Sequence, residues 1–255
     1  MIVTPYYNRP TISGLSAHYR AILDAVPLDA IVYNVPSRTG YDLKPDALER
    51  LLEDGRIQAI KEASGNASRI KELASRFSED LAILSGDDGI ALEAFEAGAV
   101  GLVSVTANLL PGQVTQVWER FKAGHTETSR ALHDALRPVH EALFIETNPG
   151  PVKAALARFG HIRAEVRLPL ALPSTAVTGG IATVVERAGF AAEARAGHRT
   201  SFRGAETGSI ARPIDGQTTE PRSAPTLGAF ELDWTDEEFS FLADESRFQA
   251  LAELA

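Results

Sequence analysis

The sequence predicts an α/β protein built on a parallel sheet, and three observations support this fold class. Between residues 30 and 124, short β-branched runs alternate with longer segments whose apolar residues recur at helical spacing. Only a few residues connect these segments, and glycine or proline stands at many of the junctions. Such alternation places consecutive strands parallel, with the helices packed against the sheet.

The repeating unit is a strand followed by a helix, and four units are complete. Strands are predicted at 30–35, 57–63, 81–86 and 100–105. Their helices are predicted at 45–55, 67–77, 88–98 and 111–124. Pro45 suits a first helical turn and Gly55 a helix end. An incomplete unit precedes them, with a strand end at 1–4 and a helix at 13–26, so we expect five consecutive units.

After residue 124 the strand pattern stops. Helices are predicted at 126–144, 148–160 and 175–189. We expect the first to kink or break before Pro138, because proline has no amide hydrogen, and Asn148 to cap the second. Beyond about 190 the composition turns to Arg, Ala, Gly, Ser and Pro without apolar periodicity. The predicted regions are therefore 1–124, 125–190 and a disordered linker with an acidic tail at 191–255.

Composition excludes several classes of function. The 255-residue chain carries a net charge of -9 and no cysteine, which argues against nucleic-acid binding and excludes thiol catalysis and thiolate metal sites. No apolar run approaches a membrane span, and the first residues lack a signal-peptide core. We expect a cytoplasmic protein. His133 and His140 share a helix face but lack a carboxylate in a ligand pattern, so no metal site is predicted.

One lysine stands where a buried strand should still be apolar. Side chains alternate faces along a strand, so Lys61 in "IQAIK" and Tyr33 in "IVYNV" point to the same side of adjacent strands. If the sheet closes into a barrel, both face inward at the carboxyl ends, where barrel active sites lie. A desolvated lysine amine is suited to forming a Schiff base, and tyrosine can move the protons. On spacing alone, a solvated lysine and a packing tyrosine are the commoner case.

Six motifs carry a resemblance to a known family. They are "IVTPYYNRPTISGLSAHYRAI", "IVYNVPSRTG", "IKEASGN", "ILSGDDGIAL", "GLVSVTANLLP" and "ETNPGPVKAAL". In this order they closely resemble the dihydrodipicolinate synthase family, also called 4-hydroxy-tetrahydrodipicolinate synthases. The resemblance implies a partial (β/α)8 TIM barrel, from the end of strand 4 through helix 8, followed by a C-terminal helical extension. It implies an N-terminally truncated member, with a tail after 190 that has no counterpart.

The resemblance also assigns roles by position. It implies that Lys61 is the Schiff-base lysine and Tyr33 the proton donor and acceptor. Tyr7 matches a relay tyrosine that a neighbouring subunit inserts, and Arg38 the arginine that receives the aldehyde's carboxylate. Further matches are Val103 and Gly86 beside the substrate and Tyr6 at a lysine-inhibition site.

The activity so implied is condensation of pyruvate with L-aspartate 4-semialdehyde, in lysine and diaminopimelate biosynthesis. The resemblance implies no cofactor beyond the covalent Schiff base with pyruvate, and a homotetramer. Two alternatives stay open. The chain is a catalytically inactive fragment or interaction module, or it is a sibling pyruvate aldolase such as N-acetylneuraminate lyase. Arg38 in "PSRTG" favours the synthase, because arginine holds a carboxylate with two parallel hydrogen bonds. Asp87 and Asp88 are interpreted as a helix cap rather than a Mg²⁺ site.

Overall fold

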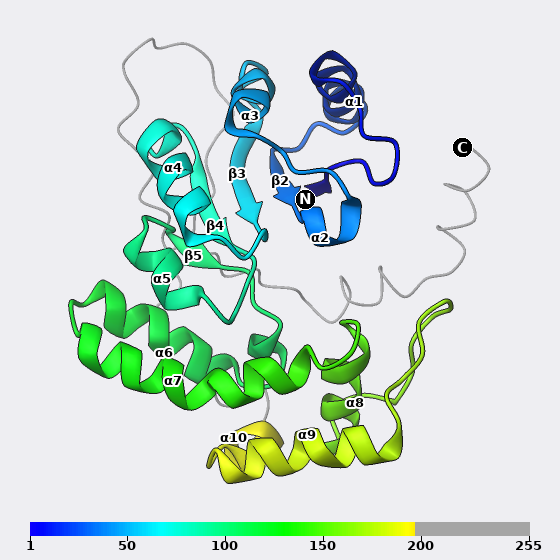
Figure 1. The fold of residues 1–255 in the computed structure, drawn as a ribbon, viewed down its shortest axis with the longest axis vertical. Helices are drawn as coiled ribbons and strands as arrows, with labels where there is room; N and C mark the ends of the chain where they lie inside the picture. Colours follow the sequence, from blue (N-terminus) through cyan, green and yellow to red (C-terminus); the bar gives the residue numbers. More distant parts are fainter. Residues whose placement is uncertain (197–255) are drawn as a thin grey trace. The chain divides into compact units, whose positions relative to one another are not determined.

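A computed structural model describes residues 1–196, and a five-stranded parallel sheet lies at their centre (Figure 1). The strands are β1 Ile2–Val3, β2 Ala30–Asn34, β3 Ile57–Glu62, β4 Ala82–Ser85 and β5 Gly101–Leu102. Their order in the sheet is their order in the chain, and each neighbouring pair is parallel. The prediction of five consecutive strand–helix units on a parallel sheet is confirmed.

Helices follow each strand and cover one face of the sheet. They are α1 Ile12–Ala25, α2 Pro36–Thr39, α3 Pro45–Leu52, α4 Ala67–Phe77, α5 Ala91–Glu96, the 3₁₀ turn η1 Thr106–Asn108 and α6 Pro111–Lys122. Leucines from successive helices pack against one apolar side of the strands, and all are buried: Leu15, Leu48, Leu73 and Leu92 with Val32, Ile60 and Ile83. Burial of this face is the main force holding the helices to the sheet.

The opposite face of the sheet is only partly covered. Along β2, Val32 and Asn34 are buried toward the helices, whereas Ile31 and Tyr33 are half-buried on the other side. Lys61 occupies the half-buried face of β3. The predicted alternation therefore holds, and it presents Tyr33 and Lys61 together on the face that the helices leave open.

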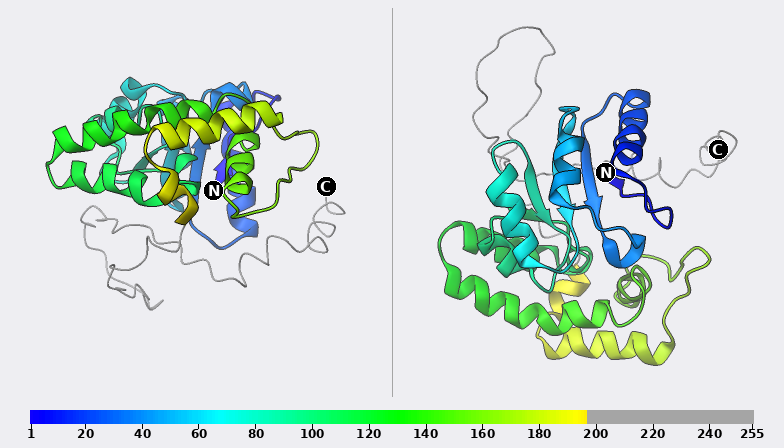
Figure 2. Two further views of the ribbon diagram at one scale, coloured as in Figure 1. Left: turned by 90° about the horizontal axis from the view of Figure 1, so that it is seen from below. Right: turned by 45° about the horizontal axis from the view of Figure 1, so that its top comes forward.

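A second group of helices follows the sheet. It comprises α7 Thr126–Leu143, α8 Gly150–Arg158, α9 Thr175–Arg187 and α10 Ala191–Ala196. Helices α6 and α7 lie side by side, and α9 contacts both α7 and α8 (Figures 1 and 2). All three helices predicted after residue 124 are therefore present.

Helix α7 is continuous through Pro138, so the prediction of a break is wrong. Proline removes one backbone hydrogen bond of the helix. The apolar side chains on either side of Pro138 are buried, namely Leu136, Val139 and Leu143. Their packing holds the helix together across the lost bond.

Three further expectations need correction. Strand β5 spans Gly101–Leu102 rather than 100–105, although the N–H groups of Val100 and Val103 extend the pairing with β4. Asn148 does not cap α8. Pro149 is the residue directly before this helix, and no side chain bonds the first amides of α8. The first residues of the expected linker, Ala191–Ala196, form α10, which His161 holds through the Ala194 carbonyl at 2.6 Å.

The remainder of the expected linker and acidic tail, 197–255, lies outside the described residues. Within 1–196, no helix is both long and apolar enough to cross a membrane.

Candidate active site

Lys61 and Tyr33 meet at the carboxyl ends of β3 and β2. Parallel pairing places the two residues in register, one opposite the other. The Lys61 Nζ atom lies 4.1 Å from the centroid of the Tyr33 ring. The sequence predicted this juxtaposition from strand periodicity and the assumption that the two strands are neighbours. The structure brings both residues together at the edge where parallel α/β sheets place their active sites.

Gly86 provides the space that the Lys61 side chain occupies. A Cβ atom at this position would lie 2.8 Å from Lys61 Cε and 2.7 Å from Ala63 Cβ. Both distances are too short for real contacts, so any side chain here would displace the lysine. The Gly86 amide donates to the Glu62 carbonyl at 2.8 Å, which fixes the glycine directly beside the end of β3.

The environment of Lys61 favours the neutral amine. Burial lowers the pKa of Lys61, the nearby Arg38 lowers it further, and the Asp88 carboxylate opposes both effects. Burial likewise raises the pKa of Tyr33, against the opposing charge of Arg38. The lowered pKa of Lys61 increases the share of neutral amine, and the raised pKa of Tyr33 keeps its phenol protonated to higher pH; both shifts suit imine formation.

Arg38 enters the site from α2, the short helix directly after β2. Its Nη2 atom donates to the Asn148 carbonyl at 3.0 Å, which links the sheet region to the start of α8. The guanidinium is exposed and close enough to act electrostatically on both Lys61 and Tyr33. An exposed, charged fork at the mouth of the site suits a substrate carboxylate.

Asp88 is buried and anchors the turn that follows β5. Its carboxylate accepts hydrogen bonds from the Ser104 hydroxyl and from the backbone N–H groups of Val105, at 2.8 Å, and Thr106, at 3.2 Å. Its bonds therefore lie at the start of η1 rather than at the start of α5, whose first turn has no side-chain cap. The expectation that Asp87 and Asp88 cap the helix that follows them is wrong for Asp88, whose carboxylate binds amides of the turn after β5; Asp87 accepts from the Gly89 amide at 2.9 Å, just before α5.

Val103 lies just before that turn and is half-buried, with its amide donating to the Ser85 carbonyl at 2.8 Å. Tyr6 and Tyr7 stand apart from the Lys61–Tyr33 contact. Their side chains are 71% and 87% exposed, and Tyr7 has a positive φ of 69°. The structure therefore brings five predicted residues to one edge of the sheet, whereas both tyrosines are exposed and the Tyr7 amide donates to the Thr39 carbonyl of α2 at 3.1 Å.

Sequence reasoning missed two buried polar residues beside Lys61 and Tyr33. Asn34 and Glu62 follow Tyr33 and Lys61 directly and point to the helix-covered face. Their amide and carboxylate are joined at 2.9 Å. The signal was present in the sequence: both positions are polar where the alternation requires an apolar residue facing the helices.

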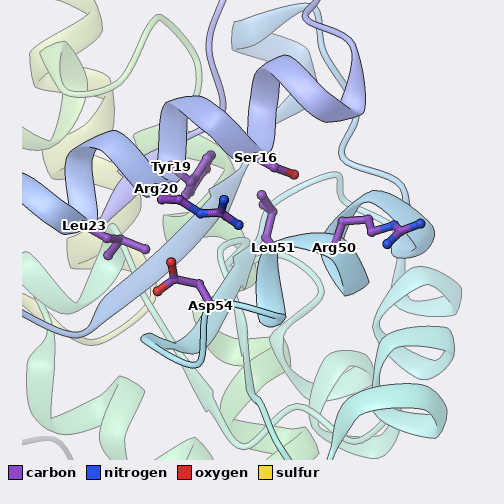
Figure 3. A pocket seen from close by; sticks show the side chains of 7 residues that line it. All are labelled: Ser16, Tyr19, Arg20, Leu23, Arg50, Leu51 and Asp54. Atoms are coloured by element: carbon purple, nitrogen blue, oxygen red, sulfur yellow. The ribbon is translucent and has the colours of Figure 1, made fainter.

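Small cavities lie elsewhere in the described region. One is lined by Ser16, Tyr19, Arg20, Leu23, Arg50, Leu51 and Asp54, between α1 and α3 (Figure 3). Another lies beside His133 and His140. Each has a volume of about 10 Å³, enough for about one water molecule. Within residues 1–196, no group of three or more His, Asp or Glu side chains is placed to hold a metal ion.

Fold and site together define a parallel strand–helix protein with a desolvated lysine amine at the carboxyl edge of its sheet. The sequence profile of the dihydrodipicolinate synthetase family matches residues 1–186. The chain belongs to this family.

Curated relatives agree with this assignment. The chain is 47% identical over 171 residues to a 4-hydroxy-tetrahydrodipicolinate synthase of Citrifermentans bemidjiense, covering 67% of this chain and 59% of the relative. It is 43% identical over 186 residues to that of Idiomarina loihiensis, covering 73% of this chain and 63% of the relative. The chain thus spans about three fifths of the length of these relatives.

Solved structures resemble the chain in fold as well. The crystal structure of dihydrodipicolinate synthase from Thermotoga maritima matches with a TM-score of 0.70 and 38% identity, over 74% of this chain and 65% of that one. A chloride-inhibited dihydrodipicolinate synthase from Acinetobacter baumannii, complexed with pyruvate, matches with a TM-score of 0.70 and 41% identity, over 74% and 65%.

Proposed function

We propose that this chain carries the Schiff-base site of a 4-hydroxy-tetrahydrodipicolinate synthase, which condenses pyruvate with L-aspartate 4-semialdehyde. One observation carries the proposal: the Lys61 amine is desolvated at the carboxyl edge of the sheet, 4.1 Å from the Tyr33 ring. The curated relatives bear the name of this activity.

The chemistry follows from the residues present. The neutral Lys61 amine attacks the pyruvate ketone, and loss of one water gives an iminium. Tyr33 shuttles the protons of this step. The iminium withdraws electrons from the neighbouring methyl group, which loses a proton and attacks the aldehyde. Arg38 receives the carboxylate of the semialdehyde and orients it for that attack. The amino group of the semialdehyde then displaces Lys61 as the ring closes.

The proposal includes the rest of the family's architecture. The region 1–124 corresponds to the end of strand 4 through helix 8 of a (β/α)8 barrel, 125–190 to the helical extension, and 191–255 to a tail outside the family. The part of the relatives that precedes this region would complete the barrel. A homotetramer in the cytoplasm follows, in which Tyr7 of one subunit reaches the site of another and Tyr6 lines an inhibitor site.

A second candidate is a chain that is not catalytic by itself. The order of the sheet leaves β1 and β5 without an outer neighbour among the described residues, and the chain covers 59% of a relative. On this alternative the chain is an inactive fragment or an interaction module. A sibling aldolase such as N-acetylneuraminate lyase has less support, because Arg38 favours a substrate with a carboxylate near the aldehyde.

Borohydride trapping tests the proposal. We expect pyruvate with borohydride to add a reduced adduct at Lys61, identified by peptide mass spectrometry, both in this chain joined to the preceding part of a relative (the completed chain) and, more weakly, in the chain alone. Lys61→Ala should abolish the adduct, whereas Lys71→Ala, at an exposed lysine of α4, should leave it intact. Tyr33→Phe should slow trapping by about 10²- to 10⁴-fold.

An adduct at a different lysine, or none in the completed chain, would refute the assignment of Lys61. Trapping in the completed chain but not in the chain alone would favour the second candidate for the 255-residue protein. An assay of product formation from pyruvate and aspartate semialdehyde distinguishes the synthase from a sibling aldolase.

A further inference from the structure

A chain of buried hydrogen bonds lies directly behind the Lys61–Tyr33 pair. Asn34 Nδ2 donates to Glu62 Oε2 at 2.9 Å and to Asp42 Oδ1 at 3.1 Å. Asn34 Oδ1 accepts from the Leu43 amide at 3.0 Å, and Glu62 Oε1 accepts from the Ser64 amide at 2.7 Å. Every polar atom of both side chains is therefore paired. The bonds join the loops that follow β2 and β3 to the strand ends.

Arg69 of α4 closes this network at its outer end. Its guanidinium donates to both Asp42 oxygens, at 3.2 and 3.3 Å, and to the Leu43 carbonyl at 3.1 Å. Burial raises the pKa of the Asp42 carboxyl, but hydrogen bonds from Lys44, Asn34 and Arg69 together hold it below its usual value. The loop after β2 is thus held to the helix that follows β3.

The burial of the Glu62 carboxylate costs folding free energy. The residue is 2% exposed, and a carboxylate is expensive to bury even when it is hydrogen-bonded. An apolar pair could pack here instead, as Val32 and Ile60 do two residues earlier on the same two strands, where they lie opposite each other. A fully paired polar network differs from apolar packing in being directional, so it fixes one geometry.

We infer that Asn34 and Glu62 are positioning residues for the Schiff-base site: their side-chain bond fixes the two strand ends that carry Tyr33 and Lys61. The register places Tyr33 opposite Lys61 and Asn34 opposite Glu62. Each catalytic residue therefore shares a backbone with one half of the bond. Holding the strand ends together keeps the Lys61 amine against the Tyr33 ring and limits the entry of water. The inference deepens the proposed function, since it concerns the same lysine.

The test measures the Lys61 amine without any substrate. Brief pulses of acetic anhydride across a pH series acylate neutral amines, and peptide mass spectrometry reads each lysine separately. The exposed Lys71 and Lys122 serve as references in the same sample. In Glu62→Gln, one of the two donors meets an amide NH₂ in place of an oxygen. We expect the labelling profile of Lys61 to move by about one pH unit toward that of a solvated lysine.

Ser129→Ala is the matched control, because it removes a buried hydrogen bond to the Val117 carbonyl between α7 and α6, far along the chain from this network. It should lower the melting temperature and leave the Lys61 profile unchanged. Glu62→Asp is the milder second variant, since it retains the charge but withdraws the carboxylate from Asn34. An unchanged Lys61 profile in folded Glu62→Asp, which keeps the carboxylate charge, would overturn the inference. Because no pyruvate is used, this outcome is independent of whether trapping succeeds.

Discussion

Single residues at the carboxyl edge of the sheet decide whether a reactive lysine fits there. Lys61 reaches the Tyr33 ring only because Gly86 leaves room for its methylene groups. Asp88 supplies a compensating negative charge while its oxygens are used by the turn after β5. The balance leaves the amine less basic than a solvated lysine, which raises the share of nucleophile at neutral pH.

Gly86→Ala is expected to disable the site without unfolding the chain. Its Cβ would overlap Lys61 Cε and Ala63 Cβ, and displacing a reacting atom by about 1 Å costs on the order of 100-fold in rate. Pyruvate trapping at Lys61 should fall by about that factor. Gly112→Ala is the matched control, since a Cβ there meets nothing within 4 Å. Equal trapping in both variants would show that Lys61 has space to spare.

Arg38 is expected to serve the second substrate rather than the first. In the completed chain, Arg38→Ala should raise the KM for aspartate semialdehyde and leave pyruvate trapping nearly unchanged. Loss of one charge-assisted contact corresponds to about 1.5–3 kcal/mol, hence roughly 10- to 100-fold in kcat/KM. Arg38 also holds the Asn148 carbonyl. Equal damage to trapping and condensation would assign Arg38 a structural role instead.

At the scale of elements, α7 joins the sheet to the helices that follow it. Its His140 ring bonds the Thr106 hydroxyl of η1 at 2.7 Å, next to the turn that Asp88 anchors. The ring of His133 lies beside it, with centroids 5.6 Å apart, and faces Glu93 of α5 at 4.0 Å. Both histidines are buried. His140 thus acts as a hydrogen-bonding group, and both rings pack in the core.

These histidines make the chain sensitive to acid. Burial lowers the pKa of His140 to about 4, with the charges of Asp88, His133 and Arg137 acting on it as well. Burial also lowers the pKa of His133, which Glu93 and Asp134 oppose. An unfolded histidine takes up its proton near pH 6.5. The unfolded chain therefore binds more protons than the folded one below pH 6.5, and stability falls between pH 6.5 and pH 4.

Urea unfolding at pH 7.5 and pH 5 measures this loss. His140 alone should remove about 2 kcal/mol of unfolding free energy over that interval. His140→Asn retains a group that bonds Thr106 but does not titrate, so it should flatten the pH dependence. His125→Asn, at an exposed position before α7, is the control and should keep the slope of the parent chain. Identical slopes in all three proteins would contradict this account.

At the scale of the molecule, the two outer edges of the sheet determine how the chain behaves in solution. Among the described residues, β1 and β5 pair on one side only. Val3 and Val100 are exposed next to these edges, and the Thr4 hydroxyl is buried without a partner. Parallel strands are normally covered on both faces, and an open apolar edge is a template for pairing with another chain.

The 255-residue chain expressed alone is therefore expected to be poorly soluble or aggregated, with negligible condensation activity. Light scattering should show assemblies that grow with concentration. Co-expression with the preceding part of a relative should suppress them by covering the edges. A monodisperse protein that turns over pyruvate and aspartate semialdehyde as fast as the completed chain would contradict this prediction. The acylation and urea tests therefore use the completed chain, in which these edges are covered.

Much of the fold could be predicted because local rules apply to it. Pro45 is the first residue of α3, and Gly55, with a φ of 78°, lies in the turn that follows this helix. Both positions match the conformational preferences of these residues. Periodicity placed Tyr33 and Lys61 on one face. The errors arose where distant partners override local preference. Packing of Leu136 and Val139 carries α7 through Pro138, and the free amides of Val105 and Thr106 attract Asp88 away from its own helix.

The sequence by itself determined the order of strands and helices, the face of each strand and the family to which the chain belongs, because these depend on short-range periodicity and on motifs. Tertiary structure alone decided the environment of Lys61. Its desolvation, the space beside Gly86 and the buried bond between Asn34 and Glu62 depend on strands that are far apart in the chain. Burial and electrostatics are properties of assembled neighbours, so no single segment specifies them.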